Sequence, residues 1–204
     1  MTQRFASILS AAASAACLLF ITPAQAQQTE TAIFAGGCFW CVESDFDHVD
    51  GVLDTTSGYI GGKSENPTYQ DHSGHVEAVR ITYDPSKVTY DTLLDVYWHS
   101  IDPTDGGGQF CDRGYSYTSA IFAVNADQLA KANATKAEVQ QQLGTVATEI
   151  RKAPKFWDAE GYHQDYYLKN PVKYKFYRSG CGRNDTVERV WGDKAFQGIK
   201  GAVS

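Results

Sequence analysis

The chain has 204 residues, a length that fits one domain, and 43% of them are hydrophobic, which is enough to bury a core. The formal net charge is −6, and the sequence contains no cluster of lysine and arginine that could neutralise a run of phosphates. We therefore expect an ordinary core-forming domain that does not bind nucleic acid.

The first 26 residues differ in composition from the rest. Arg4 precedes a run of apolar and small residues, and Ala24-Gln25-Ala26 forms an A-x-A cleavage pattern. A membrane-anchoring helix and a lipidated Cys17 are the alternatives, but Ser and Thr dilute the run, and Ser14 stands where a lipid box needs a bulky aliphatic residue. We expect residues 1–26 to be a cleaved signal peptide and the mature protein, 27–204, to be secreted into the periplasm. No other apolar run is long enough to span a bilayer, so we expect no stable membrane insertion.

The mature chain alternates strand and helix patterns without strict regularity. Strands are expected over residues 31–37, 52–62, 75–84, 115–124 and 146–152, and helices over 38–49, 85–101 and 126–143. In the third strand Glu77, Val79, Ile81 and Tyr83 share one face, because side chains alternate along a strand. Beyond residue 152 the chain is aromatic and polar, and it ends in an irregular tail with one short helix. This pattern predicts a single α+β domain.

The stretch AGGCFWCVES, residues 35–44, places two cysteines three residues apart, directly after a glycine pair. Cys38 falls at the start of a predicted helix, where unpaired backbone N–H groups lower the pKa of a thiol. The local sequence fits a nucleophile and a small buried residue equally well. Cys41 lies at a spacing that fits a redox dithiol, half of a zinc site or an accidental neighbour. Because Cys111 and Cys181 are isolated, the second half of a zinc site is missing, and we expect no metal.

The motif GGCFWCVE resembles the active-site signature of peptide methionine sulfoxide reductases of the A type, which are specific for the S epimer. The similarity continues in the same order through GVLDTTSGYIGG, NPTYQDHSGHVEAVRITYDP, DRGYSYTSAIF, FWDAEGYHQDYYLKNP and YKFYRSGCGR. It implies that residues 27–204 are a catalytic domain that reduces methionine S-sulfoxide, in oxidised proteins or as the free amino acid, and so repairs oxidative damage. It also implies a two-layer sandwich with a ferredoxin-like core, a mixed sheet, flanking helices and a long irregular C-terminal tail.

The resemblance implies roles for the residues of the motif and for one carboxyl group. Cys38 would be the nucleophile, and Phe39 and Trp40 would form the hydrophobic wall that receives the S-methyl group. Glu77 would donate a proton to the sulfoxide oxygen. This proton is needed because a sulfoxide sulfur is a poor electrophile until its oxygen is protonated.

Three further residues match the family's pocket. Tyr59, in SGYIGG, and Tyr117, in YSYTSA, would hold the sulfoxide oxygen, and Asp112, in CDRG, would line the pocket. Each has an ordinary alternative, a packed tyrosine or a solvated carboxylate. His72, His75 and His163 are also close to these motifs in the sequence. We expect these histidines to be structural hydrogen-bonding groups and not partners of a catalytic cysteine.

The remaining cysteines concern the regeneration of the enzyme. Attack on the sulfoxide would leave Cys38 as a sulfenic acid, which a second thiol condenses to a disulfide. We expect Cys41 to be the first resolving thiol because it is close in sequence, and Cys181, which matches a resolving position of many members, to be the second. The alternative is direct attack by Cys181, with Cys41 a bystander. Cys111 stands where the family usually has no cysteine, and its role is open.

The resemblance implies no bound cofactor. Electrons would come from an external thiol, either a thioredoxin-like protein or a small dithiol, and the protein would act as a monomer. Two other classes of function remain open at this point. The dithiol of Cys38 and Cys41 fits a general disulfide oxidoreductase, and an aromatic-rich binding module with structurally paired cysteines fits the composition.

Overall fold

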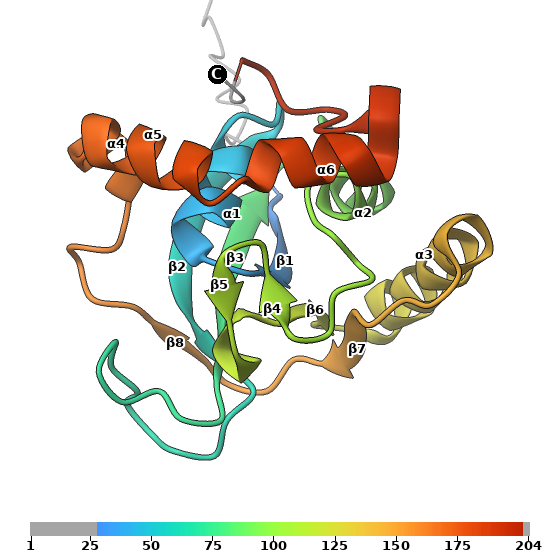
Figure 1. The fold of residues 1–204 in the computed structure, drawn as a ribbon. Coiled ribbons are helices and arrows are strands. Elements are labelled where there is room, and N and C mark those ends of the chain that lie inside the picture. The colour runs from blue at the N-terminus through green and yellow to red at the C-terminus, as the bar shows by residue number, and fades with distance from the viewer. Residues whose placement is uncertain (1–27, 202–204) are drawn as a thin grey trace, which may run out of the picture.

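The computed structural model describes residues 28–201, so the expected signal peptide, 1–26, lies outside the described residues. The centre of the molecule is a six-stranded sheet with the order β7-β6-β1-β3-β2-β8 (Figure 1). Its strands are β1 (Glu30–Gly36), β2 (Val52–Ile60), β3 (Val76–Tyr83), β6 (Ser119–Ala123), β7 (Glu149–Lys152) and β8 (Phe156–Asp158). A separate two-stranded ribbon consists of β4 (Gly108–Gln109) and β5 (Asp112–Arg113).

Helices flank this sheet, as the sequence predicts. They are α1 (Phe39–Asp47), α2 (Tyr90–Trp98), α3 (Ala126–Leu143), α4 (Tyr166–Lys169), α5 (Pro171–Gly180) and α6 (Arg183–Trp191), with 3₁₀ turns at Tyr115–Tyr117 and Gly192–Lys194. Strands β6 and β7 pair in parallel and the other neighbours pair antiparallel, so the sheet is mixed. The α+β class and the mixed sheet are therefore confirmed. Within residues 28–201 we find no helix with both the length and the apolar character needed to cross a bilayer.

The main core lies on the face of the sheet that α1 and α2 cover. The alternation expected for the third strand is confirmed, because Val79, Ile81 and Tyr83 of β3 pack into this core while Val76 and Ala78 pack on the opposite face. Glu77 lies on the same face of β3 as Val79, Ile81 and Tyr83. The strand period therefore directs one carboxyl group into the interior.

A glycine pair sets the sharp turn from β1 into α1. Gly37 has φ = +84°, and a Cβ at this position would lie 2.6 Å from the Cβ of Gln109. A Cβ at Gly36 would lie 2.9 Å from Ile101. Glycine alone allows both the left-handed backbone and this close approach. The turn places Cys38 at the N-cap of α1.

The expectation of a long irregular tail is wrong for residues 166–194, which form three helices and a 3₁₀ turn. Pro171 begins α5, where a missing N–H costs nothing, and Gly182 separates α5 from α6 with φ = +68°. In Figure 1 these helices run across the molecule next to α1. Arg178 and Arg183 reach the buried carboxylate of Asp45 at 2.8 and 3.3 Å. A local sequence pattern does not reveal these long-range ion pairs.

Candidate active site

A small cavity of about 50 Å³ lies at the N-terminus of α1. It brings together six of the residues that the sequence nominates and two that it does not. The lining consists of Cys38, Phe39, Trp40, Tyr69, Glu77, Asp112, Tyr117 and Tyr177. These residues come from α1, β3, α5, the loop before β3 and the segment that contains β5 and the 3₁₀ turn.

Glu77 supplies the cavity with a buried carboxyl group that is only 1% exposed. Burial raises its pKa to about 8, and the nearby charges of Asp112 and Cys41 act in the same direction. The backbone N–H of Phe39 donates a hydrogen bond to Glu77 Oε2 at 3.0 Å and partly opposes this shift. At neutral pH most of the carboxyl groups therefore carry a proton that they can donate into the cavity.

Cys38 and Cys41 are both buried, free thiols. Burial raises the pKa of Cys38 well above its usual value, an effect that outweighs the helix N-terminus on which the sequence-based expectation rests. The hydrogen bond from Cys38 lowers the pKa of Cys41 to about 7, and the positive charges of Arg183 and Arg178 contribute. The two sulfurs therefore titrate as a pair, in which burial opposes ionisation at Cys38 and the arginines favour it at Cys41.

The structure corrects the assignment of Tyr59. Its hydroxyl donates to Glu160 Oε2 at 3.0 Å, its ring packs behind Phe39, and it does not line the cavity. Tyr69 occupies the place expected for Tyr59, since it lines the cavity and its hydroxyl interacts with that of Tyr117. Burial raises the pKa of both Tyr69 and Tyr117, so both remain hydrogen-bond donors.

Tyr69 and Tyr59 are nevertheless connected. Glu160 accepts from the backbone N–H of Tyr69 at 2.9 Å through its other oxygen, so one carboxylate joins the loop that carries Tyr69 to β2. Tyr69 lies in a segment that reads as a polar loop by composition. The signal that could have found it is an aromatic residue in an otherwise polar stretch, directly after Asn66-Pro67-Thr68.

Tyr177 of α5 is a second residue that sequence reasoning missed. Its hydroxyl donates to Asp112 Oδ2 and also lies within hydrogen-bonding reach of the Cys38 sulfur. Burial raises the pKa of Asp112, against the hydrogen bond from Tyr177. The C-terminal helices therefore contribute a wall of the cavity.

Trp40 is held rigidly as part of the apolar wall. Its indole N–H donates to His163 Nδ1 at 3.0 Å, and its ring stacks on Tyr166 with centroids 3.7 Å apart and an angle of 6°. Burial lowers the pKa of His163, so the ring is neutral and can accept this bond. The expectation of structural histidines is confirmed, since His72 and His75 also bond locally, to backbone oxygens 3.1 and 3.0 Å away.

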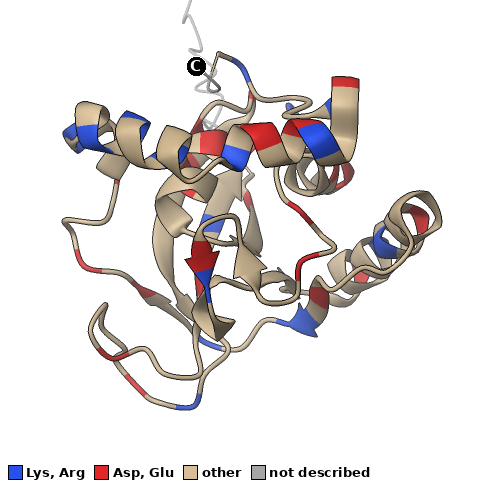
Figure 2. Cartoon of the chain, viewed as in Figure 1, with Lys and Arg blue, Asp and Glu red and all other residues tan. Residues whose placement is uncertain are grey.

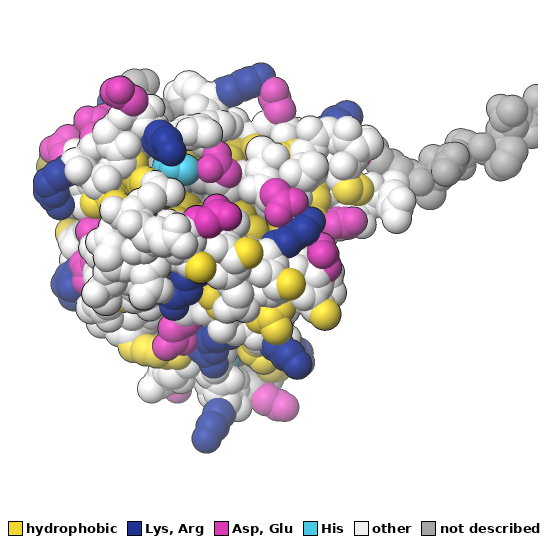
Figure 3. All heavy atoms as spheres, turned by 90° about the vertical axis from the view of Figure 1, so that its right-hand side faces the viewer, with side chains coloured by type: hydrophobic (Ala, Val, Ile, Leu, Met, Phe, Trp, Pro, Cys, Tyr) yellow, Lys and Arg dark blue, Asp and Glu magenta, His cyan; other side chains and the backbone are white. Residues whose placement is uncertain are grey.

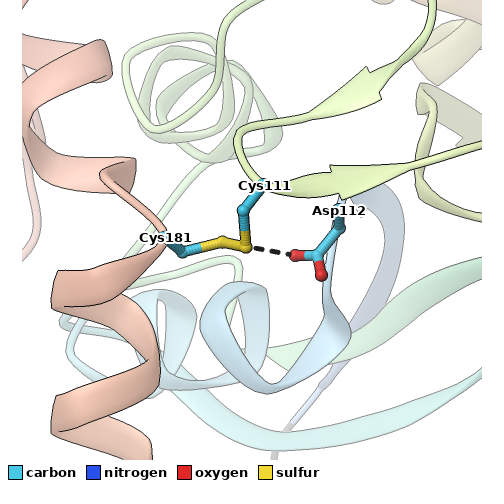
Figure 4. Close-up of side chains that lie close together, drawn as sticks. All are labelled: Cys111, Asp112 and Cys181. Carbon is cyan, nitrogen blue, oxygen red and sulfur yellow. Dashed lines mark hydrogen bonds between the residues drawn. A yellow bond between two sulfur atoms is a disulfide. The ribbon is translucent and has the colours of Figure 1, made fainter.

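Cys181, which the sequence predicts to be the second resolving thiol, is bonded to Cys111 in a disulfide (Figure 4). The two residues are 70 positions apart in the sequence, and their Cα atoms are 4.9 Å apart. Asp112 Oδ2 lies 3.7 Å from Cys181 Sγ, so the disulfide touches a residue of the cavity wall. Cys111, Asp112 and Cys181 could approach one metal ion, but sulfurs joined in a disulfide are not thiolate ligands.

Comparison with known proteins agrees with this geometry. Residues 30–195 match the family described as peptide methionine sulfoxide reductase. Peptide methionine sulfoxide reductase MsrA 2 of Rhizobium meliloti is 55% identical over 186 residues, which cover 90% of this chain and 93% of that protein.

Solved structures are similar as well. Methionine sulfoxide reductase A of Corynebacterium diphtheriae is 33% identical with a TM-score of 0.68, covering 72% of this chain and 77% of that one. Reduced Mxr1 of Saccharomyces cerevisiae is 30% identical with a TM-score of 0.66, covering 72% of this chain and 88% of that one. Mxr1 in complex with Trx2 superposes with a TM-score of 0.51 at 22% identity, over 72% and 91% of the two chains, and shows the fold alone. The chain belongs to the peptide methionine sulfoxide reductase family.

Proposed function

We propose that the chain reduces methionine S-sulfoxide to methionine in a thiol-dependent reaction, in oxidised proteins and as the free amino acid, with Cys38 as the nucleophile. One observation carries this proposal. A single cavity joins the Cys38 sulfur to the protonated carboxyl group of Glu77 and to hydroxyl donors. A sulfoxide needs these groups together, because its sulfur accepts an electron pair as its oxygen accepts a proton.

The reaction balances with the groups present. The proton of Cys38 moves to Cys41, with which it shares a hydrogen bond, and the Cys38 sulfur attacks the sulfoxide sulfur. Glu77 donates its proton to the sulfoxide oxygen, while Tyr69 and Tyr117 stabilise that oxygen by hydrogen bonds. The S–O bond of the substrate breaks, methionine leaves, and Cys38 becomes a sulfenic acid.

The apolar side of the cavity selects and orients the substrate. Phe39 and Trp40 present ring surface beside Cys38, and the bonds of Trp40 to His163 and Tyr166 keep this surface fixed. The wall suits a small apolar group such as the S-methyl. With the methyl on one side and the oxygen on the hydroxyl side, only one configuration at sulfur presents its rear face to Cys38.

We also propose the finer points of fold and assembly. The succession β1-α1-β2-β3-α2-β6, with the order β6-β1-β3-β2, supports a ferredoxin-like core.

The electron donor is a thioredoxin-like protein, in keeping with Mxr1, which has been solved in complex with Trx2. The protein binds no cofactor and acts as a monomer, which sedimentation at working concentrations tests. The basic side chains are scattered among acidic ones on the face in Figure 3, which supports the expectation that nucleic acid is not a partner.

The function is tested by Cys38→Ser on each epimer of a methionine sulfoxide substrate. Wild-type protein with dithiothreitol should reduce the S epimer and leave the R epimer, and Cys38→Ser should abolish turnover. Cys111→Ser is the matched cysteine control and should leave a single turnover of the S epimer nearly unchanged. Appreciable turnover by Cys38→Ser would disprove the mechanism.

Glu77→Gln should slow the reductive step by about 10²–10⁴-fold, because it preserves the size of the side chain and removes the proton. The wild-type rate should also fall as the pH rises through about 8, since Glu77 loses its proton there. In Glu77→Gln this decline should be absent. Single-turnover rates over a pH series check both points, with Glu149→Gln on β7 as an exposed control. A loss well below tenfold at neutral pH would mean that Glu77 is not the acid.

The two tyrosine assignments can be separated by removing one hydroxyl at a time. Tyr69→Phe should lower the single-turnover rate about 10- to 100-fold, the effect of about 1.5–3 kcal/mol for a hydrogen bond to a group that gains charge. Tyr59→Phe should have a smaller effect on the rate and a larger one on thermal stability, because its hydroxyl bonds Glu160 away from the cavity. If Tyr59→Phe lowered the rate more than Tyr69→Phe, then Tyr59 would be the residue that holds the sulfoxide oxygen.

Regeneration begins with Cys41 and continues with Cys181 in our proposal. The hydrogen bond between the Cys38 and Cys41 side chains supports the first step. Wild-type protein that retains its Cys111–Cys181 disulfide, oxidised with one equivalent of substrate and digested without reduction, should therefore yield a Cys38–Cys41 disulfide, and so should Cys181→Ser. Cys41→Ser should complete one turnover and then recycle slowly. If the Cys38–Cys41 bond never forms, Cys181 attacks Cys38 directly.

Export to the periplasm remains our proposal for localisation, supported by the composition of residues 1–26 and by the A-x-A pattern. Protein made in a secreting host should begin at Gln27. Intact mass of the purified protein checks this expectation. A retained Met1, or a lipid on Cys17, would contradict it.

A further inference from the structure

The two pairs of cysteines differ in their access to solvent. Cys38 and Cys41 are both buried, and Cys38 lines the cavity of about 50 Å³. Cys111 is exposed and Cys181 is half-buried, and their disulfide lies at the surface between the β4–β5 ribbon and the junction of α5 with α6 (Figure 4). A protein dithiol is far too large to enter the cavity. Cys111, by contrast, is an exposed residue, which a protein dithiol can approach at the surface.

We infer that Cys111 is the sulfur at which a protein dithiol delivers its electrons, and that the Cys111–Cys181 disulfide passes them on to the buried pair. The inference rests on the proposed function and assigns a role to a cysteine that the reductive step does not use. The partner is a thioredoxin-like protein whose first active-site thiolate attacks Cys111.

The exchange conserves electrons and atoms. The partner thiolate attacks Cys111 Sγ, the Cys111–Cys181 bond breaks, and Cys181 leaves as a thiolate. The second thiol of the partner then displaces Cys111, so that the partner is oxidised and two thiols remain on the enzyme. Cys181 attacks the Cys41 sulfur of an oxidised Cys38–Cys41 pair and frees Cys38. Attack by Cys111 on Cys181 then frees Cys41 and re-forms the surface disulfide.

Asp112 lies at the point where the two pairs approach each other. Its carboxyl oxygen is 3.7 Å from Cys181 Sγ, and its side chain lines the cavity that contains Cys38. Burial raises the pKa of the Asp112 carboxyl group, against the hydrogen bond from Tyr177. Tyr177 bonds Asp112 and reaches Cys38, so the surface disulfide is linked to the nucleophile through two polar side chains.

An apolar stripe on the helices that lead to Cys181 suits a protein partner. Val172 and Phe176 lie one turn apart on α5 and are 82% and 83% exposed, and Leu168, on α4 before the break at Asn170, is 63% exposed. Exposed apolar side chains of this size in a row are typical of a protein-binding surface. Phe176 also lines a surface hollow of about 470 Å³ that reaches Gly180, the residue before Cys181.

The charge on this stripe specifies the partner further. Residues 166–180 contain no acidic residue and include the exposed Lys173 and Lys175, although the whole chain has a net charge of −6 (Figure 2). Arg178 of this segment is buried against Asp45, and Lys169 pairs with Asp165. A protein whose active-site dithiol is surrounded by apolar and acidic side chains complements this surface. We therefore assign the docking of the reductant to the stripe Leu168, Val172 and Phe176.

The entry point can be trapped chemically. Oxidised wild-type protein is mixed with a thioredoxin whose second active-site cysteine is replaced by serine, and the mixed disulfide is mapped by mass spectrometry after non-reducing digestion. The thioredoxin should be attached to Cys111. Attachment to Cys38, Cys41 or Cys181 would overturn the inference. A parallel single turnover of methionine S-sulfoxide by pre-reduced protein shows whether the proposed function holds, so the two failures are distinguishable.

Kinetics give a second test. In Cys111→Ser the ratio of thioredoxin-driven to dithiothreitol-driven steady-state turnover should fall at least tenfold, with the single-turnover rate unchanged. Phe176→Ser combined with Val172→Ser should raise the KM for thioredoxin at least fivefold and leave dithiothreitol-driven turnover intact. Leu53→Ser, at an exposed apolar residue on β2, is the matched control. An unchanged turnover ratio would overturn the role of Cys111, and an unchanged KM would overturn the docking surface.

Discussion

The site depends on the ion pairs that the buried carboxylate of Asp45 forms with two arginines. Asp45 lies on α1, fully enclosed, and pairs with Arg178 on α5 and with Arg183 at the start of α6. Removal of one partner from a buried ion pair typically costs about 3–5 kcal/mol, because a charge is left uncompensated. The pairing therefore holds the C-terminal helices against the helix that begins at Cys38. Tyr177, next to Arg178 in the chain, is thereby held at the wall of the cavity.

The same arginines divide the two thiols into different roles. Their positive charge reaches Cys41 and helps to lower its pKa to about 7, while burial raises the pKa of Cys38 and brings that of Glu77 to about 8. At neutral pH the site therefore contains a proton donor and, next to the nucleophile, a sulfur that accepts the nucleophile's proton. Environments that move the pKa values of neighbouring groups apart are typical of acid–base catalysis.

The sequence predicts best what is contiguous or periodic. Cys38, Phe39 and Trp40 form one motif, and the strand period directs Glu77 towards them. The sequence predicts poorly the features that depend on contacts between residues far apart in the chain. Tyr69 enters the cavity from a polar loop that Glu160 anchors, whereas the resemblance to the family pointed to Tyr59 in β2. The tail helices and the Cys111–Cys181 pairing likewise arise from groups far apart in the chain, and cysteine spacing alone does not determine a connectivity.

A cavity of about 50 Å³ imposes a conflict that the second pair of cysteines resolves. The enclosure that raises the pKa of Glu77 also excludes a protein. A wider opening would admit the reductant directly, but it would also admit water and return the carboxyl group towards its ordinary pKa. A surface disulfide in contact with Asp112 lets electrons enter without opening the cavity. Burial for acid catalysis and access for a protein dithiol can therefore coexist in one small domain.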